Sequence, residues 1–254
     1  ENKKVKSAIS KINSNIINVK GYESIINEKA LDKWLKILNE QSVIAVDTET
    51  SSLNPLEADL VGISFSYAPN KACYIPLAHK NIKGLKKEVV LKKIKPILED
   101  PSIKKVGQNI KFDYIIFYHK GIKMNAMEDT MLMSYVLDAG KNRHNMDVLS
   151  EIHLDHKTIA FKDIVGTGKK QINFSEVKVD IAKDYAAEDA DITFRLYKIF
   201  SKNIKLEKMK IRSLLRKIIY PSLMLTMILK IGLNKLKVWS GSLREERDAV
   251  PVLR

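Results

Sequence analysis

Residues 42–50, SVIAVDTET, are the stretch that most constrains the fold of this chain. The run is short, apolar and rich in β-branched residues, which is typical of a strand buried inside a sheet. Two more strand-like runs follow closely, LVGISFSYA at 60–68 and ACYIPLAH at 72–79. Three strands at this spacing predict a meander that opens the sheet.

Helical patterns surround this meander. Leucine and tryptophan recur at helical spacing in EKALDKWLKILNEQ, just before the first strand. Further helices are predicted at 87–100, 109–120, 128–138 and 179–205, another strand begins at 104–110, and 139–175 is predicted to be a long mobile region. This order indicates an α/β domain around a mixed sheet.

The first strand ends in two carboxylates, Asp47 and Glu49. Side chains two apart on a strand point to the same face, so these two acids project together. Adjacent carboxylates repel each other unless a cation lies between them. An ordinary acidic turn after a strand is the alternative explanation.

Two helical segments place further polar groups on shared faces. Asn109 and Asp113 are four residues apart, which separates them by about 40° around a helix axis. Tyr185 and Asp189 have the same spacing in YAAEDADIT.

The other acids of that stretch are less well placed for the same role. Glu188 lies about 60° around the helix from Tyr185, on the side opposite Asp189, and it is not excluded as a ligand. Asp191 is roughly 120° away, so we expect it to be solvated or paired with Arg195 four residues later.

The candidate ligands are four carboxylates, those of Asp47, Glu49, Asp113 and Asp189. Carboxylates without cysteine or histidine ligands select hard divalent ions, Mg²⁺ or Mn²⁺. Two such ions about 4 Å apart can hold the attacking and leaving oxygens of a phosphoryl displacement. Tyr185 is a poor base, since the unperturbed pKa of tyrosine is about 10, and we expect it to orient the attacking water.

The bulk composition favours a polyanionic partner. The formal net charge is +14, with only one cysteine, so neither a disulfide framework nor a cysteine-based zinc site is expected. A generally lysine-rich proteome is the alternative. Basic side chains outnumber acidic ones between 195 and 217, which suggests phosphate contacts. The apolar run at 218–229 contains Pro221 and is too short to span a membrane.

Around the four carboxylates and Tyr185, the sequence resembles the 3′–5′ proofreading exonuclease domain of family A DNA polymerases. DTET, NIKFD and YAAED are similar to the three motifs of that family, in order, and the resemblance extends over about residues 22–200. It implies an RNase H-like fold with a mixed five-stranded sheet flanked by helices.

The resemblance also implies roles for single residues. Asp47, Glu49 and Asp189 would hold the first of two metal ions, and Asp113 would reach the second through water. The implied substrate-binding residues are Thr48, Leu53 as an apolar wedge, Asn109, Arg143 in the cleft, and Phe161 against the 3′-terminal nucleotides.

We therefore expect a flexible lead-in at 1–20, an exonuclease domain at 21–205, a helical extension at 206–239 that resembles the start of a polymerase domain, and a disordered tail at 240–254. The expected function is a free-standing exonuclease on single-stranded DNA 3′ ends. An RNA-directed exonuclease and a non-catalytic nucleic-acid-binding remnant are the alternatives. We expect no membrane partner, a monomer or a weak homodimer through the extension, and a bacterial cytoplasmic location, or an organellar one if a targeting segment was trimmed.

Overall fold

The computed structural model describes residues 16–82 and 84–206. The predicted lead-in falls mostly outside these residues, and the predicted helical extension and tail fall almost entirely outside them.

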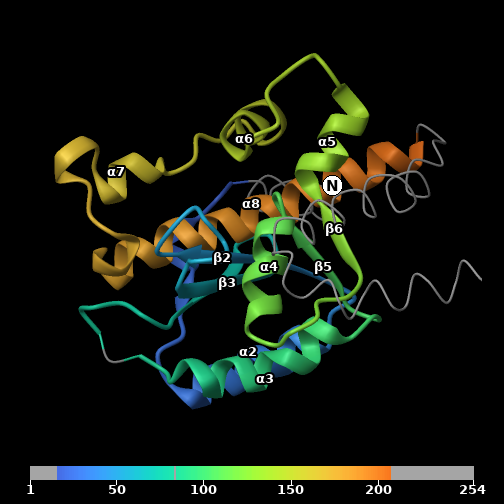
Figure 1. The fold of residues 1–254 in the computed structure, drawn as a ribbon. Coiled ribbons are helices and arrows are strands. Elements are labelled where there is room, and N and C mark those ends of the chain that lie inside the picture. The colour runs from blue at the N-terminus through green and yellow to red at the C-terminus, as the bar shows by residue number, and fades with distance from the viewer. Residues whose placement is uncertain (1–15, 83, 207–254) are drawn as a thin grey trace, which may run out of the picture. The chain divides into compact units, whose positions relative to one another are not determined.

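A mixed sheet forms the centre of the described domain (Figure 1). Its order is β1-β4-β3-β2-β5-β6. The meander β2–β3–β4 is antiparallel, whereas β5, β6 and β1 each run parallel to their neighbour. The strands are β1 (Glu23–Ser24), β2 (Val43–Thr50), β3 (Leu60–Ala68), β4 (Lys71–Pro76), β5 (Lys104–Gly107) and β6 (Met127–Asp129).

The described residues thus form six strands rather than the expected five. The α/β class and the opening meander are confirmed, while β1 and β6 are additions to the strands predicted from the pattern. β1 has two residues and β6 has three, too few for an alternating pattern to be recognised. β6 also occupies the first positions of the helix predicted at 128–138.

Helices cover both faces of the sheet. α8 contacts every strand from β1 to β5, and α2 and α3 contact each other on the opposite side in Figure 1. The helices are α2 (Glu28–Asn39), α3 (Lys87–Glu99), α4 (Lys111–His119), α5 (Thr130–Asp138), α6 (Met146–Leu154), α7 (Phe161–Val165) and α8 (Val179–Leu206).

Small side chains let α8 lie close to the sheet. Ala182 and Ala186 are fully buried against Val61 of β3 and Tyr74 of β4. Further along the helix, Ile192 and Leu196 pack in a second cluster with residues of β5, α5 and α6. The close approach at the alanines brings the polar side chains of the same turns near the end of β2.

The region 139–175 is not the long unstructured segment that its composition suggested. It contains α6, α7 and the 3₁₀ turn η2 (Gly168–Lys170), and it leads into a second turn, η3 (Phe174–Glu176). A capping box between Asn173 and Glu176 begins η3.

Candidate active site

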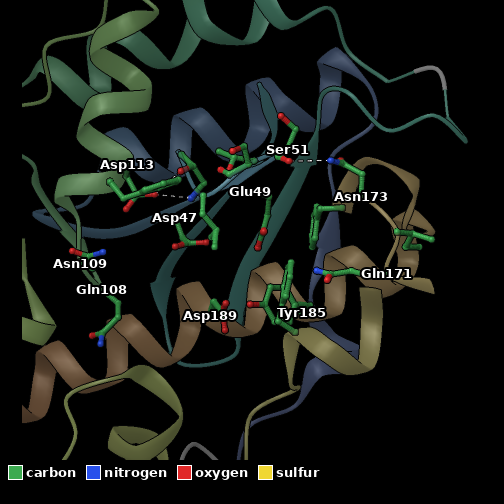
Figure 2. A pocket seen from close by; sticks show the side chains of 18 of the residues that line it. Asp47, Glu49, Ser51, Gln108, Asn109, Asp113, Gln171, Asn173, Tyr185 and Asp189 are labelled. Carbon is green, nitrogen blue, oxygen red and sulfur yellow. Dashed lines mark hydrogen bonds between the residues drawn. The ribbon is translucent and has the colours of Figure 1, made fainter. Parts of the chain in front are cut away.

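Three carboxylates meet where the end of β2 faces α8 (Figure 2). Asp47 and Glu49 come from the strand, and Asp189 comes from the helix. Each offers an oxygen, and the three oxygens all lie within 4.8 Å of one another. Glu49 and Asp189 are buried and Asp47 is partly exposed. The alternation of the strand therefore places its two acids together, as their spacing predicted.

One oxygen of this group has no hydrogen-bond partner within the described part of the chain. Oε1 of Glu49 is buried and accepts no hydrogen bond among the residues that the structure describes. Buried polar atoms in folded proteins are nearly always paired, so an orphaned carboxylate oxygen next to two other carboxylates fits a bound cation.

The electrostatics of the three carboxylates also favour a bound cation. Burial and the neighbouring charge of Asp189 raise the pKa of Asp47 well above its ordinary value. Burial, Asp47 and Asp189 raise the pKa of Glu49, and burial and Glu188 raise the pKa of Asp189. A divalent cation would offset this repulsion and hold the acids in their charged form. The donor set fits a divalent metal ion.

Asp113 of α4 lies beside this group but is held separately. Its Oδ1 accepts hydrogen bonds from the backbone nitrogen of Thr48, at 2.9 Å, and from the Thr48 hydroxyl, at 2.6 Å. Burial and the charge of Asp47 raise its pKa well above the usual range. The fourth predicted carboxylate thus reaches the same pocket from another element.

Tyr185 lines the same pocket as Asp189, which follows four residues later on α8. Burial, followed by the charges of Asp189 and Glu49, raises the Tyr185 pKa well above its ordinary value. The hydroxyl therefore stays protonated and can donate a hydrogen bond. This agrees with the expectation that Tyr185 is not a base.

An open pocket of about 790 Å³ extends from the carboxylates. Leu53, 93% exposed, and Phe161, 43% exposed, lie on its wall. Phe161 stacks on Phe174, with the ring planes 5° apart and the centroids at 6.2 Å. Exposed apolar side chains beside a cluster of acids are suited to contact nucleotide bases.

Of the predicted substrate residues Asn109 and Arg143, only Asn109 lines the pocket. Asn109 lines the pocket, but it precedes α4 and has a φ of 58°, so the expectation that it shares a helical face with Asp113 is wrong. Asparagine tolerates this left-handed conformation better than most residues. Arg143 is exposed and is not among the residues that line the pocket.

Asp191 is paired with Arg195, as the helical spacing predicted, but it is not on a solvated surface. It is fully buried and also accepts hydrogen bonds from the Tyr22 hydroxyl and the Asn70 backbone. Arg195 is 6% exposed in this pair, so it is not available for the phosphate contacts expected of the stretch it begins. The network ties α8 to the start of the domain.

Further pocket residues were not singled out from the sequence: Gln108, Gln171 and Asn173. Asn173 donates from Nδ2 to the carbonyl oxygen of Ser51 at 2.9 Å, which joins the loop before η3 to the end of β2 (Figure 2). The capping-box pattern NFSE was the available signal for Asn173.

A mixed α/β sheet whose central strand and adjoining helices gather four acids in an open pocket defines an RNase H-like nuclease. Solved structures agree in fold. NrnC of Brucella melitensis has a TM-score of 0.55 and 21% identity, covering 75% of this chain and 83% of its own. RNase D of Escherichia coli has a TM-score of 0.56 and 17% identity, covering 73% and 45%.

Sequence relatives give the family. DNA polymerase I of Pseudomonas aeruginosa is 42% identical over 182 residues, which cover 69% of this chain and 20% of that protein. DNA polymerase I of Rhizobium leguminosarum is 41% identical over 196 residues, covering 69% and 19%. The family of 3′–5′ exonuclease domains of DNA polymerase A matches residues 22–205, and this chain belongs to it. The chain spans about a fifth of the length of these relatives.

Membership of this family makes the chain an enzyme of the 3′–5′ exonuclease type, and the predicted resemblance is confirmed. Among residues 16–82 and 84–206, no helix combines the length and the apolar character needed to cross a membrane.

Proposed function

We propose that this chain removes nucleotides one at a time from the 3′ end of single-stranded DNA, by hydrolysis that depends on two divalent metal ions, Mg²⁺ or Mn²⁺. The observation that carries the proposal is the group formed by Asp47, Glu49 and Asp189, whose oxygens lie within 4.8 Å of one another and include the unpaired Oε1 of Glu49. Asp113 lies beside this group in the same pocket.

Each carboxylate has a place in this mechanism. Asp47, Glu49 and Asp189 would hold one ion, and Asp113 and Asp47 would serve the second. Bound ions supply a hydroxide at neutral pH and stabilise the oxygen that leaves. Tyr185 donates a hydrogen bond that orients the attacking water.

The pocket wall favours an unpaired 3′ end. Leu53 extends into solvent and Phe161 presents its ring, so a terminal base can be wedged and stacked only after it has left a duplex. Thr48, Asn109 and Arg143 complete the proposed substrate contacts. Thr48 also holds Asp113 through two hydrogen bonds.

DNA is the preferred substrate in this proposal because the similar sequences are those of DNA polymerases. RNA is the second candidate, since the fold neighbours include RNase D, described as an exoribonuclease. A structure of NrnC with bound Mg²⁺ and another with bound pGG support metal-dependent chemistry on nucleic acid in this fold.

We propose that the domain acts in the bacterial cytoplasm, as a monomer or a weak homodimer. The bacterial origin of the relatives supports the location.

The test uses 5′-labelled single strands of DNA and RNA of the same sequence, with Mg²⁺ or Mn²⁺. The expected result is a ladder that shortens from the 3′ end, faster for DNA, and that disappears with Asp47→Ala. Glu57→Ala is the matched control, since Glu57 is an exposed acid in the loop after β2 and lies outside the pocket lining. Binding without shortening would identify a non-catalytic remnant.

A further inference from the structure

Glu188 is the immediate neighbour of the metal-binding Asp189 on α8, yet it serves a different partner. It is 1% exposed, and it is not part of the group of three carboxylates. Its Oε2 accepts a hydrogen bond from the backbone nitrogen of Ile159 at 2.7 Å, and its Oε1 is 2.8 Å from Nε2 of His156. Both oxygens are therefore occupied by the segment that joins α6 to α7.

This joining segment, residues 155–160, is held from two sides. On the side of α6, the Ser150 hydroxyl donates to the His156 carbonyl at 2.8 Å, and the Thr158 hydroxyl donates to Asp147 at 2.7 Å. On the side of α8, Glu188 holds the segment through its contacts with His156 and Ile159. Glu188 thus fixes the joining segment to the helix that carries the metal ligand.

The joining segment ends at the stacking residue of the pocket. Ile159 is two residues before Phe161, the first residue of α7. The Phe161 ring is 5.9 Å from the ring of Tyr185, measured between centroids. The hydrogen bond from Ile159 to Glu188 therefore links two parts of the pocket. It ties the segment that carries the Phe161 ring to the turn of α8 that carries the Asp189 carboxylate.

We propose that Glu188 is a positioning residue that sets the distance between the stacking ring of Phe161 and the metal-binding carboxylates, so that the terminal phosphodiester lies at the metal site when the base is stacked. This inference rests on the proposed function. The Glu188 carboxylate is buried, and a buried carboxylate without hydrogen-bond donors is unfavourable. Glu188 is therefore expected to keep its contacts with Ile159 and His156 in every folded molecule.

The first experiment measures KM, kcat and the Mg²⁺ concentration for half-maximal rate on a single-stranded DNA oligonucleotide. Glu188→Ala is expected to raise KM about tenfold, as expected for a misplaced stacking contact, while kcat changes less than about threefold. The Mg²⁺ requirement should not change. Glu188→Gln should keep most of the affinity, because its amide oxygen can still accept from Ile159.

The second experiment is a double-mutant cycle with Phe161→Ala. Once the ring is gone, Glu188→Ala should raise KM no further. The same loss of effect should appear with the unaltered ring on an oligonucleotide whose two 3′-terminal nucleotides are abasic, since this probe has no terminal bases to stack. His156→Ala provides a second variant that should show the same coupling if Glu188→Ala folds poorly.

Asp191→Ala is the matched control, because Asp191 is a buried acid of the same helix whose hydrogen bonds go to Tyr22, Asn70 and Arg195 instead. It should lower the melting temperature and leave the KM effect of Phe161→Ala unchanged. Additive effects of Glu188→Ala and Phe161→Ala would overturn the proposal, and a shifted Mg²⁺ requirement would assign Glu188 to the metal instead. Wild-type protein that does not degrade the oligonucleotide would refute the proposed function itself.

Discussion

Thr48 donates two hydrogen bonds to Asp113, one from its backbone nitrogen and one from its hydroxyl. It lies between Asp47 and Glu49 on β2, so three successive residues of one strand serve the site. The outer two contribute their own carboxylates, and the middle one holds the carboxylate of α4. The position of Asp113 therefore depends on the strand as well as on its own helix.

Replacing Thr48 by valine should lower kcat about tenfold and raise the metal concentration needed for activity. Valine keeps the shape and the backbone donor of threonine but lacks the hydroxyl, so Asp113 keeps one of its two hydrogen bonds. The bond that is lost has a charged acceptor and is therefore stronger than a bond between neutral groups. Steady-state rates measured across a Mn²⁺ titration would show the change. Thr48→Ser should restore most of the rate.

Thr50→Val is the matched control for this prediction, since the Thr50 hydroxyl donates to the Ser52 carbonyl instead. An equal loss of rate in both valine variants would mean that the hydroxyl of Thr48 has no special relation to Asp113.

Replacing Asp47 by asparagine should stabilise the metal-free protein while abolishing activity. Burial and repulsion raise the pKa of Asp47, so its charge opposes folding when no cation is present. Relief of about 1 kcal/mol would raise the melting temperature by about 2–4 °C in a domain of this size. Thermal unfolding with a chelator present measures this directly.

The same experiment with added Mg²⁺ should reverse the order of stability. Metal that binds only the folded state raises the melting temperature of the wild type, and the asparagine variant should gain little. A wild type that is unaffected by Mg²⁺ and Mn²⁺ would contradict a metal site at these carboxylates.

Tyr185→Phe should lower kcat by about one to two orders of magnitude, because the attacking water loses an orienting donor. The raised pKa of Tyr185 keeps the hydroxyl protonated throughout the usual assay range. The pH–rate profiles of wild type and variant should therefore be parallel up to about pH 10. An alkaline limb that is present in the wild type and absent from the variant would show that Tyr185 ionises during the reaction.

Asp129 gives a prediction about folding stability. It is buried at the start of α5, and burial raises its pKa from 3.8 to about 6, although backbone donors at Asn109, Ile110, Met131 and Leu132 act in the opposite direction. Because the folded state holds the proton more tightly than the unfolded state, the contribution of Asp129 is fully present below about pH 4 and is lost as the pH rises through about 6.

The measurement is the free energy of unfolding by urea between pH 4 and 7. Asp129→Asn should flatten this part of the curve because asparagine does not titrate. Its amide would also face the Ile110 nitrogen, which now donates to Oδ2, so the variant should be less stable at every pH. An unchanged slope would assign the pH dependence to other groups.

Strand alternation and helical spacing were sufficient to predict the meander, α8 and the shared face of Asp47 and Glu49, because these features follow from local periodicity. The meeting of these two acids with Asp189 of α8 is a contact between distant residues, and it was expected from the order of the three family-like motifs. Local periodicity failed at Asn109, whose left-handed backbone is held by Asp129 from 20 residues away. It also missed the order of residues 139–175, where the anchoring acid Glu188 comes from a distant helix. Contacts between distant residues leave no period in the sequence.

Oε1 of Glu49, which accepts no hydrogen bond among the described residues, makes the metal-free fold sensitive to substitution at the carboxylate positions. Neutral side chains at the carboxylate positions should fold more readily in the absence of metal, so mutation would replace these acids in any lineage that no longer needed cleavage. Folding stability in the absence of metal therefore gives no reason for their joint presence at the end of β2 and on two helices.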